Sequence, residues 1–288
     1  MTSASRGFGA AFRLTLITAD PGLAADADAA GVNRIGVDFE HLGKAERQAG
    51  HDTRISRHGW SDLAAIAGAV RQAAVFARLN PVHSGTADEV ERALGLGASV
   101  LMLPCFATAG EVEQFLCCVR GRARVVILVE LAAAVMRIRE ILAVEGIDEV
   151  MLGLNDLHLQ FRVGNHFEVL ASPVVDMLAS EVRSKGLSLA VGGVGRVGDT
   201  TLPVRADLVL AQYPRLGATG AWLARSFLGG LPASGTLADS VCALRTRLDE
   251  WGAASAEELE SARIELARAA AAWSRADTSR VTQRGRRD

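Results

Sequence analysis

Short apolar runs recur along the chain, and segments with helical spacing of apolar residues lie between them. Each run is continuously apolar rather than alternating, which is typical of strands buried on both faces of a parallel sheet. The segments between the runs, such as 86–97 and 174–186, place apolar residues three and four positions apart and end on glycine, a common helix stop. The runs predict eight strands, which begin at Leu14, Arg34, Ala74, Ser99, Arg124, Glu149, Ser188 and Asp207.

Eight strand–helix units in this order favour an α/β fold, the (β/α)8 TIM barrel, with a doubly wound open sheet as the alternative. Residues 1–13 then form an N-terminal arm, and residues 14–230 form the barrel, with 217–230 as the helix of the eighth unit. Residues 231–274 are predicted to be a helical appendage that packs on the barrel or on a neighbouring subunit. Residues 275–288 are polar and basic, which indicates a disordered tail.

The composition is that of a globular protein. The 288 residues are 49% hydrophobic, and 31 basic residues nearly balance 33 acidic ones, so the net charge of −2 provides no overall basic field for nucleic acid. The N-terminus lacks a signal-peptide core, and the longest apolar run, 125–136, is interrupted by Glu130 and too short to span a bilayer. We expect a cytoplasmic protein without a nucleic-acid or membrane partner.

The four cysteines match neither a zinc-binding spacing nor a dense disulfide framework. They are therefore expected to be buried apolar thiols. They are Cys105, Cys117, Cys118 and Cys242.

Reactive side chains gather where the predicted strands end. The carboxyl ends of barrel strands meet on one face of the barrel, and that face carries the chemistry in TIM-barrel enzymes. The sequence therefore predicts that these residues share one rim. They are Asp38, Glu40, His41, Arg78, Asn80, Glu130, Asn155 and Asp156.

Glu130 and Asp156 end two neighbouring predicted strands. A carboxylate at the mouth of a core is costly unless a partner or a metal neutralises it. Two carboxylates would leave open positions for waters and a chelating substrate, which is how magnesium is usually held. Arg78 matches a substrate carboxylate bidentately. The spacing leaves alternatives open, in which the carboxylates cap the following helices or pair with Arg78.

His41 is a candidate proton carrier at neutral pH, with Asp38 or Glu40 placed to orient or activate it. The alternative is a surface histidine at the start of a loop. Lys44 is the lysine nearest a predicted strand end, where it would place a positive charge (a cationic lip) at the edge of the site for an anionic substrate. The alternative is that Lys44 belongs to the solvated start of a helix.

Five segments of the chain resemble, in matching order, the HpcH/HpaI aldolase and citrate lyase beta-subunit family. Glu130 and Asp156 fall in the family's E-x-x-x-A and G-x-x-D-L contexts, and their separation of 26 positions (156 − 130) fits the family pattern. The resemblance covers roughly residues 14–228. The segments are VDFEH at 37–41, ARLNP at 77–81, the stretch 95–115, the stretch 127–157 and GGVGR at 192–196.

The resemblance implies a barrel of the phosphoenolpyruvate/pyruvate type, which uses Mg²⁺ or Mn²⁺ to make or break a carbon–carbon bond beside a 2-oxo acid or acyl thioester. By position in the family pattern, Glu130 and Asp156 would be the metal ligands. Arg78 would clamp the carboxylate or steady the enolate oxygen, and Glu40 and His41 fall on the acid/base position.

The same resemblance places backbone amides around Gly153 and Asn155 on the carboxylate of pyruvate. Two loops depart from the family pattern, at 118–130 and at 155–170, and these lie where the second substrate would bind. The identity of that second substrate therefore cannot be carried over from the family.

We predict a homo-oligomeric, divalent-metal-dependent carbon–carbon lyase or aldolase that acts on a pyruvate- or oxaloacetate-type 2-oxo acid through a metal-stabilised enolate. The second substrate would be an aldehyde or an acyl-CoA. One alternative is a citrate lyase-like hydroxyacyl-CoA lyase, for which the sequence shows no dedicated basic cluster. The other is a non-catalytic metal- or anion-binding barrel that serves as a scaffold.

Overall fold

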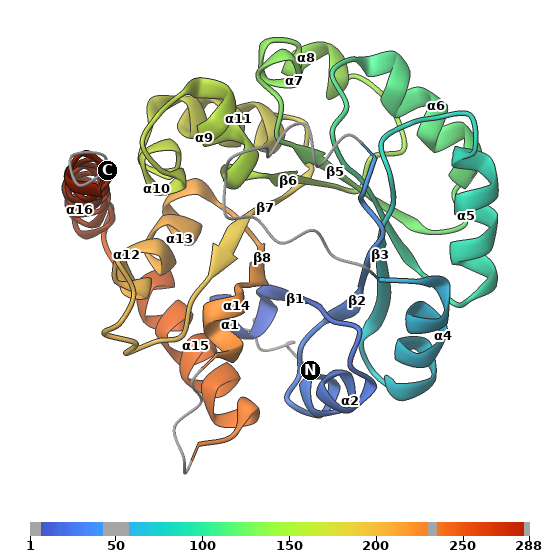
Figure 1. The fold of residues 1–288 in the computed structure, drawn as a ribbon, viewed down its shortest axis with the longest axis horizontal. Helices are drawn as coiled ribbons and strands as arrows, with labels where there is room; N and C mark the ends of the chain where they lie inside the picture. The colour runs from blue at the N-terminus through green and yellow to red at the C-terminus, as the bar shows by residue number, and fades with distance from the viewer. Residues whose placement is uncertain (1–6, 43–57, 230–234, 285–288) are drawn as a thin grey trace, which may run out of the picture.

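Eight parallel strands close into a barrel in the order β1 to β8 (Figure 1). The computed structural model describes residues 7–42, 58–229 and 235–284, with side chains up to 276. The predicted (β/α)8 fold is confirmed. The strands are β1 Arg13–Ile17, β2 Arg34–Asp38, β3 Ala74–Arg78, β4 Val100–Leu103, β5 Arg124–Val129, β6 Glu149–Leu152, β7 Ser188–Val194 and β8 Gly220–Leu223.

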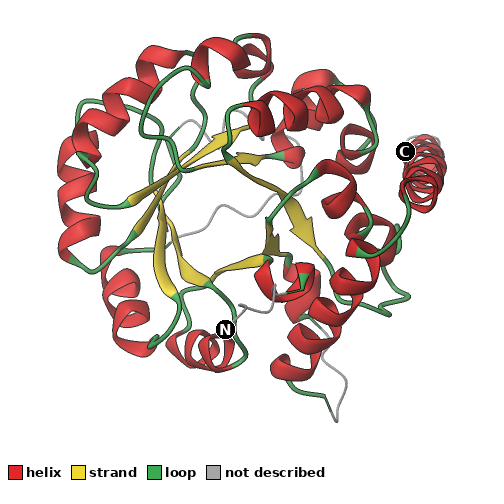
Figure 2. Cartoon of the chain, turned by 180° about the vertical axis from the view of Figure 1, so that it is seen from behind, coloured by secondary structure: helices red, strands yellow, loops and turns green. Residues whose placement is uncertain are grey.

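Helices surround the strand ring and bury its outer face (Figure 2). Within the described ranges, no helix is both long and apolar enough to cross a membrane. The helices are α1 Phe8–Ala11, α2 Pro21–Ala29, α4 Trp60–Ala69, α5 Thr86–Gly95, α6 Ala109–Val119, α7 Ala132–Met136, α8 Ile138–Ile141, α9 Leu154–Phe161, α10 His166–Leu170, α11 Pro173–Ser184, α12 Ala206–Leu210, α13 Gln212–Leu216, α14 Arg225–Leu228, α15 Leu237–Gly252 and α16 Ala256–Arg284.

The predicted position of the eighth strand is wrong. The apolar run from Asp207 forms the helices α12 and α13, and the strand is the short segment Gly220–Leu223, which lies inside the predicted helix 217–230. The run is buried on nearly every side, so it is continuously apolar in a helix as it would be in a strand. The real β8 is recognised instead by its pairing with β7 and β1, which closes the barrel.

The two ends of the chain pack together beside the barrel. The Gly9 N–H donates to Asp249 Oδ1 at 2.7 Å, and Arg245 donates to the carbonyls of Gly9 and Phe12, so α1 lies on α15. α16 packs on α10, α12 and α13, and Asn165 Nδ2 donates to the Ala270 carbonyl at 2.9 Å. The helical assignment of α16 reaches Arg284, past the boundary that the sequence places at 274.

The interior of the barrel is apolar in its middle and charged at both ends. Near the strand starts, Arg34 makes a bidentate ion pair with Glu149 at 2.8 and 2.9 Å, and Arg13 Nε donates to the same carboxylate at 3.1 Å. Arg34 and Glu149 are buried, so the pair joins β2 to β6 across the barrel floor. The middle layer consists of Phe76, Val100, Met102, Val126, Leu128, Met151 and Ala190.

Replacing Glu149 with Gln should destabilise the barrel by about 3–5 kcal/mol, because it leaves the buried charge of Arg34 without its counterion. Urea unfolding followed by circular dichroism measures this change. Glu91→Gln is the matched control, since Glu91 pairs with Arg122 at the surface and should change stability far less. Equal effects of the two variants would contradict this assignment.

Candidate functional site

Asp38 and Arg78 are the last residues of β2 and β3, and they pair directly across the two strands. Arg78 Nε and Nη2 donate to the two carboxylate oxygens of Asp38 at 2.8 and 2.6 Å, and Arg78 Nη1 lies 3.1 Å from Glu40 Oε2. All three side chains are buried. Burial lowers the pKa of Arg78, but the charges of Asp38 and Glu40 outweigh it and raise that pKa above its ordinary value.

Glu130 follows β5 directly and is 2% exposed. Its Oε1 accepts hydrogen bonds from the backbone N–H of Cys105 at 3.0 Å and from Cys105 Sγ at 3.0 Å. The same sulfur lies 3.4 Å from Glu40 Oε1. Cys105 comes two residues after β4 and has φ of +52°, an uncommon conformation for a residue with a side chain. The thiol is therefore held between two buried carboxylates.

Asp156 does not end a strand, which corrects the sequence-based expectation. β6 stops at Leu152, and Asp156 lies in the first turn of α9, where a carboxylate favours the helix N-terminus. Asn155 is exposed on the same turn. The apolar run continues past the strand because Leu154 and Leu157 are buried helix residues, so hydrophobicity alone hides the boundary.

Gly153 brings α9 close to Glu130. A Cβ at position 153 would stand 2.7 Å from the Cβ of Glu130 and 3.0 Å from its Oε2. Glu130 therefore directs Oε1 toward Cys105 and Oε2 toward the start of α9. The backbone N–H groups of the first helical turn have no partner within an α-helix and form an anion-binding end.

Burial, followed by the charges of Glu40 and Asp156, raises the pKa of Glu130 to about 8; the charge of Arg78 and the hydrogen bond from Cys105 oppose this rise. Among the described residues, three carboxylates thus surround the guanidinium of Arg78, and the fourth, Asp156, acts on Glu130. Such a cluster of negative charge suits a divalent cation. One ligand atom each from Glu40, Cys105 and Glu130 lies within 4.8 Å of the others. The donor set fits a metal ion.

His41 and Asn80 occupy the outer part of this rim. His41 is exposed; its backbone N–H donates to Asn80 Oδ1 at 3.0 Å, and its Nδ1 lies 2.8 Å from the carbonyl oxygen of Phe39. Asn80 is buried and donates to Glu89 Oε1 at 2.7 Å, so it orders the turn after β2. The predicted cationic lip, Lys44, lies outside the described residues.

The expectation that all four cysteines are buried apolar thiols is wrong. Cys117 and Cys242 are exposed, and Cys118 is half-buried. Cys105 is buried, but among carboxylates. The sequence does not single out Cys105, because its contacts with Glu40 and Glu130 join residues that follow different strands.

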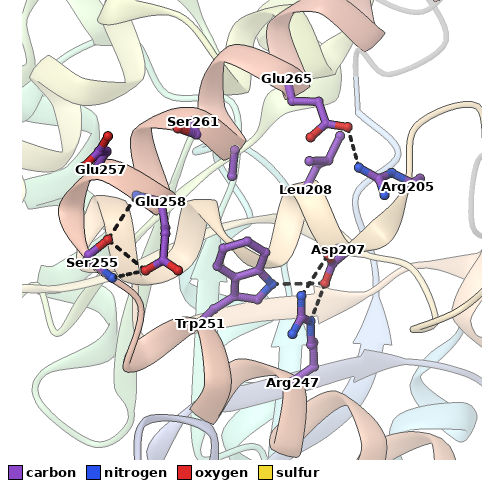
Figure 3. Close-up of a pocket in the computed structure, with 11 residues that line it drawn as sticks. Arg205, Asp207, Leu208, Arg247, Trp251, Ser255, Glu257, Glu258, Ser261 and Glu265 are labelled. Atoms are coloured by element: carbon purple, nitrogen blue, oxygen red, sulfur yellow. Dashed lines mark hydrogen bonds and ion pairs between the residues drawn. The ribbon is translucent and has the colours of Figure 1, made fainter.

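The hollow drawn in Figure 3 has a volume of about 400 Å³ and lies between α12, α15 and α16. Asp207 accepts from Arg247 and from the indole N–H of Trp251, and Arg205 pairs with Glu265. These charges neutralise one another and fasten the appendage to the barrel. None of the predicted site residues lines this hollow.

Comparison with known proteins identifies a family. The family model described as HpcH/HpaI aldolase/citrate lyase matches residues 14–179. No match to a curated protein sequence was found.

Three solved structures share the fold. An HpcH/HpaI aldolase from Desulfitobacterium hafniense DCB-2 has a TM-score of 0.59 at 16% identity, over 75% of this chain and 86% of that one. Citrate synthase SbnG has a TM-score of 0.57 at 16% identity, over 76% of this chain and 89% of that one. An HpcH/HpaI aldolase/citrate lyase family protein from Burkholderia cenocepacia J2315 has a TM-score of 0.56 at 18% identity, over 74% of this chain and 87% of that one.

The stability of the metal-free protein should fall as the pH rises from about 4.5 to about 8. With a folded-state pKa of about 8 against an ordinary value of 4.5, Glu130 holds more proton in the folded state than in the unfolded state across this window. In Glu130→Gln the side chain at this position is neutral at every pH, so the stability of this variant should change less with pH across the same window. The melting temperature in EDTA between pH 5 and pH 8.5 measures the effect.

Glu91→Gln, at an exposed carboxylate, should keep the pH dependence of the parent protein. If Glu130→Gln also keeps it, Glu130 does not carry a raised pKa.

Proposed function

We propose, on the premise that this chain belongs to the HpcH/HpaI aldolase/citrate lyase family, that it is a divalent-metal-dependent lyase or aldolase for a 2-oxo acid of the pyruvate or oxaloacetate type. The family and the barrel support the lyase/aldolase class. The observation that carries the finer proposal is the buried carboxylate of Glu130, on which the charges of Glu40 and of Asp156, in the first turn of α9, both act.

Glu130 and Asp156 would hold the metal, with Glu40 beside them. A bound dication of this kind supplies Lewis-acid polarisation of carbonyl and carboxylate oxygens. The buried carboxylates suit this role, because the repulsion that raises the pKa of Glu130 is relieved by a positive charge.

Arg78 is the group in this chain best placed to bind a substrate oxygen. A guanidinium has five N–H groups, and among the described residues Asp38 and Glu40 take three of those of Arg78. The remaining N–H groups can donate to an oxygen that gains charge as the neighbouring carbon–carbon bond breaks. Asp38 fixes the guanidinium plane through two bonds, so this donor is oriented before the substrate arrives.

The start of α9 would receive the substrate carboxylate. The N–H groups of Leu154, Asn155 and Asp156 belong to the first turn, where helix geometry leaves them without an intrahelical partner. The same turn approaches Glu130 closely at Gly153. A carboxylate bound there would place its 2-oxo group between this turn and Arg78.

His41 is the proposed proton carrier. Its Nδ1 lies 2.8 Å from the Phe39 carbonyl oxygen, which only accepts, so Nδ1 carries the proton and Nε2 has the free lone pair. His41 is exposed at the end of β2, where Nε2 can exchange a proton with solvent or with a substrate hydroxyl.

An acyl thioester remains the alternative to an aldehyde as second substrate. One of the similar structures is titled a citrate synthase, and at 16% identity the likeness shows the fold alone. Citrate synthesis and lysis also act on the carbon beside a 2-oxo acid or a thioester, so the same strand-end groups would serve.

Calorimetric titration of the metal-stripped protein tests the proposal. Pyruvate and oxaloacetate should bind only when Mg²⁺ or Mn²⁺ is present, and Asp156→Asn should lose this coupling because it removes a ligand charge. Asp88→Asn is the matched control. Asp88 lies in the first turn of α5, as Asp156 lies in that of α9, but Asp88 is exposed whereas Asp156 is half-buried, and the control should keep the coupling.

If neither the cations nor the oxo acids bind to the parent protein, the carboxylates are structural and the enzyme proposal fails. If Asp88→Asn loses the coupling as fully as Asp156→Asn, the effect comes from the helix terminus and not from a ligand.

A further inference from the structure

We infer that Cys105 supplies a thiolate ligand, so that Glu40, Cys105 and Glu130 form a site for a thiophilic dication such as Zn²⁺ or Co²⁺ in preference to Mg²⁺. The inference rests on the metal site of the proposed function. It changes the expected ion, because the two carboxylates considered from the sequence indicate Mg²⁺ or Mn²⁺.

The three ligand atoms converge from three different strand ends. Glu40 follows β2, Cys105 follows β4 and Glu130 follows β5, and all three residues are buried. The sulfur lies 3.0 Å from Glu130 Oε1 and 3.4 Å from Glu40 Oε1. With a sulfur ligand at about 2.3 Å and oxygen ligands at about 2.0–2.2 Å, a tetrahedral zinc ion sets sulfur and oxygen about 3.5–3.7 Å apart. The separation from Glu40 Oε1 is already close to this value, and a small outward movement of Glu130 Oε1 would bring the other to it.

The backbone aims the sulfur at the carboxylates. Cys105 adopts φ of +52°, a left-handed conformation that is uncommon for a residue with a side chain. In this conformation both its N–H and its Sγ reach the same oxygen of Glu130. The N–H fixes the carboxylate, and the sulfur lies beside one oxygen of each glutamate, so that all three atoms can bind one cation.

Ligand chemistry then selects the ion. Magnesium prefers six oxygen ligands and loses its waters reluctantly, whereas zinc and cobalt accept sulfur with oxygen at low coordination number. A thiolate between two carboxylates therefore favours the softer ions. On binding, the Cys105 thiol gives up its proton to solvent, as does Glu130 where it is protonated, so protons are released with the metal.

Cobalt titration of the metal-stripped full chain tests the inference. The parent protein should bind Co²⁺ with a near-ultraviolet thiolate-to-cobalt charge-transfer band, and Cys105→Ser should lose that band. A variant with Cys117, Cys118 and Cys242 all changed to Ser is the matched control, because its one remaining cysteine is Cys105, and it should keep the band.

Metal affinities measured by competition give the second readout. Cys105→Ser should weaken Zn²⁺ binding by about ten-fold or more, since even ligand-supporting residues contribute that much, and should change Mg²⁺ binding much less. Circular dichroism and the melting temperature verify that each variant is folded. Cys105→Asp offers a carboxylate in place of the thiol and should bind Co²⁺ without the band.

Two outcomes overturn the inference: Co²⁺ binds the parent protein without the charge-transfer band, or Cys105→Ser binds Zn²⁺ as tightly as the parent does. In either case metal-dependent binding of an oxo acid would still support the proposed function. If the band appears and depends on Cys105 while no oxo acid binds, the thiolate site stands and the proposed function fails.

Discussion

The carboxyl group of Glu130, buried at the mouth of a hydrophobic barrel, is the constraint on which the rest of the site depends. Burial, followed by the charges of Glu40 and Asp156, raises the pKa of this group to about 8. Arg78 is attracted to Glu130 but is already bound by Asp38 and Glu40. Among the described residues, the carboxylates at this end outnumber the positive groups, and such a site is suited to a cation.

The two ends of the barrel use buried charge differently. At the strand starts, Arg34 and Arg13 satisfy both oxygens of Glu149, which gives a closed ion cluster with a structural role. At the strand ends, one oxygen of Glu130 accepts from a thiol, and a helix begins against the other at Gly153. The closed ion cluster has a structural role, whereas the strand ends are the face that carries the chemistry in TIM-barrel enzymes.

The sequence predicts the barrel well because seven strands are continuous apolar runs closed by polar residues, and Glu130, Arg78 and Glu40 stand directly at those closures. It misplaces β8 because a buried helix, Ala206–Leu210, is as apolar as a strand and longer than the real four-residue strand. It places Asp156 at a strand end for the same reason. Cys105 is missed because its importance comes from a contact between β4 and β5 that no local pattern encodes.

The central claim is that these strand ends stabilise negative charge on a 2-oxo acid, and deuterium exchange tests it most directly without knowledge of the second substrate. Pyruvate is incubated in D2O with the metal-loaded protein, and loss of its methyl proton signal is followed by NMR. The account predicts exchange well above the rate with metal alone, and loss of that exchange in folded Glu130→Gln. No exchange by the parent protein, or equal exchange by the variant, would contradict the account.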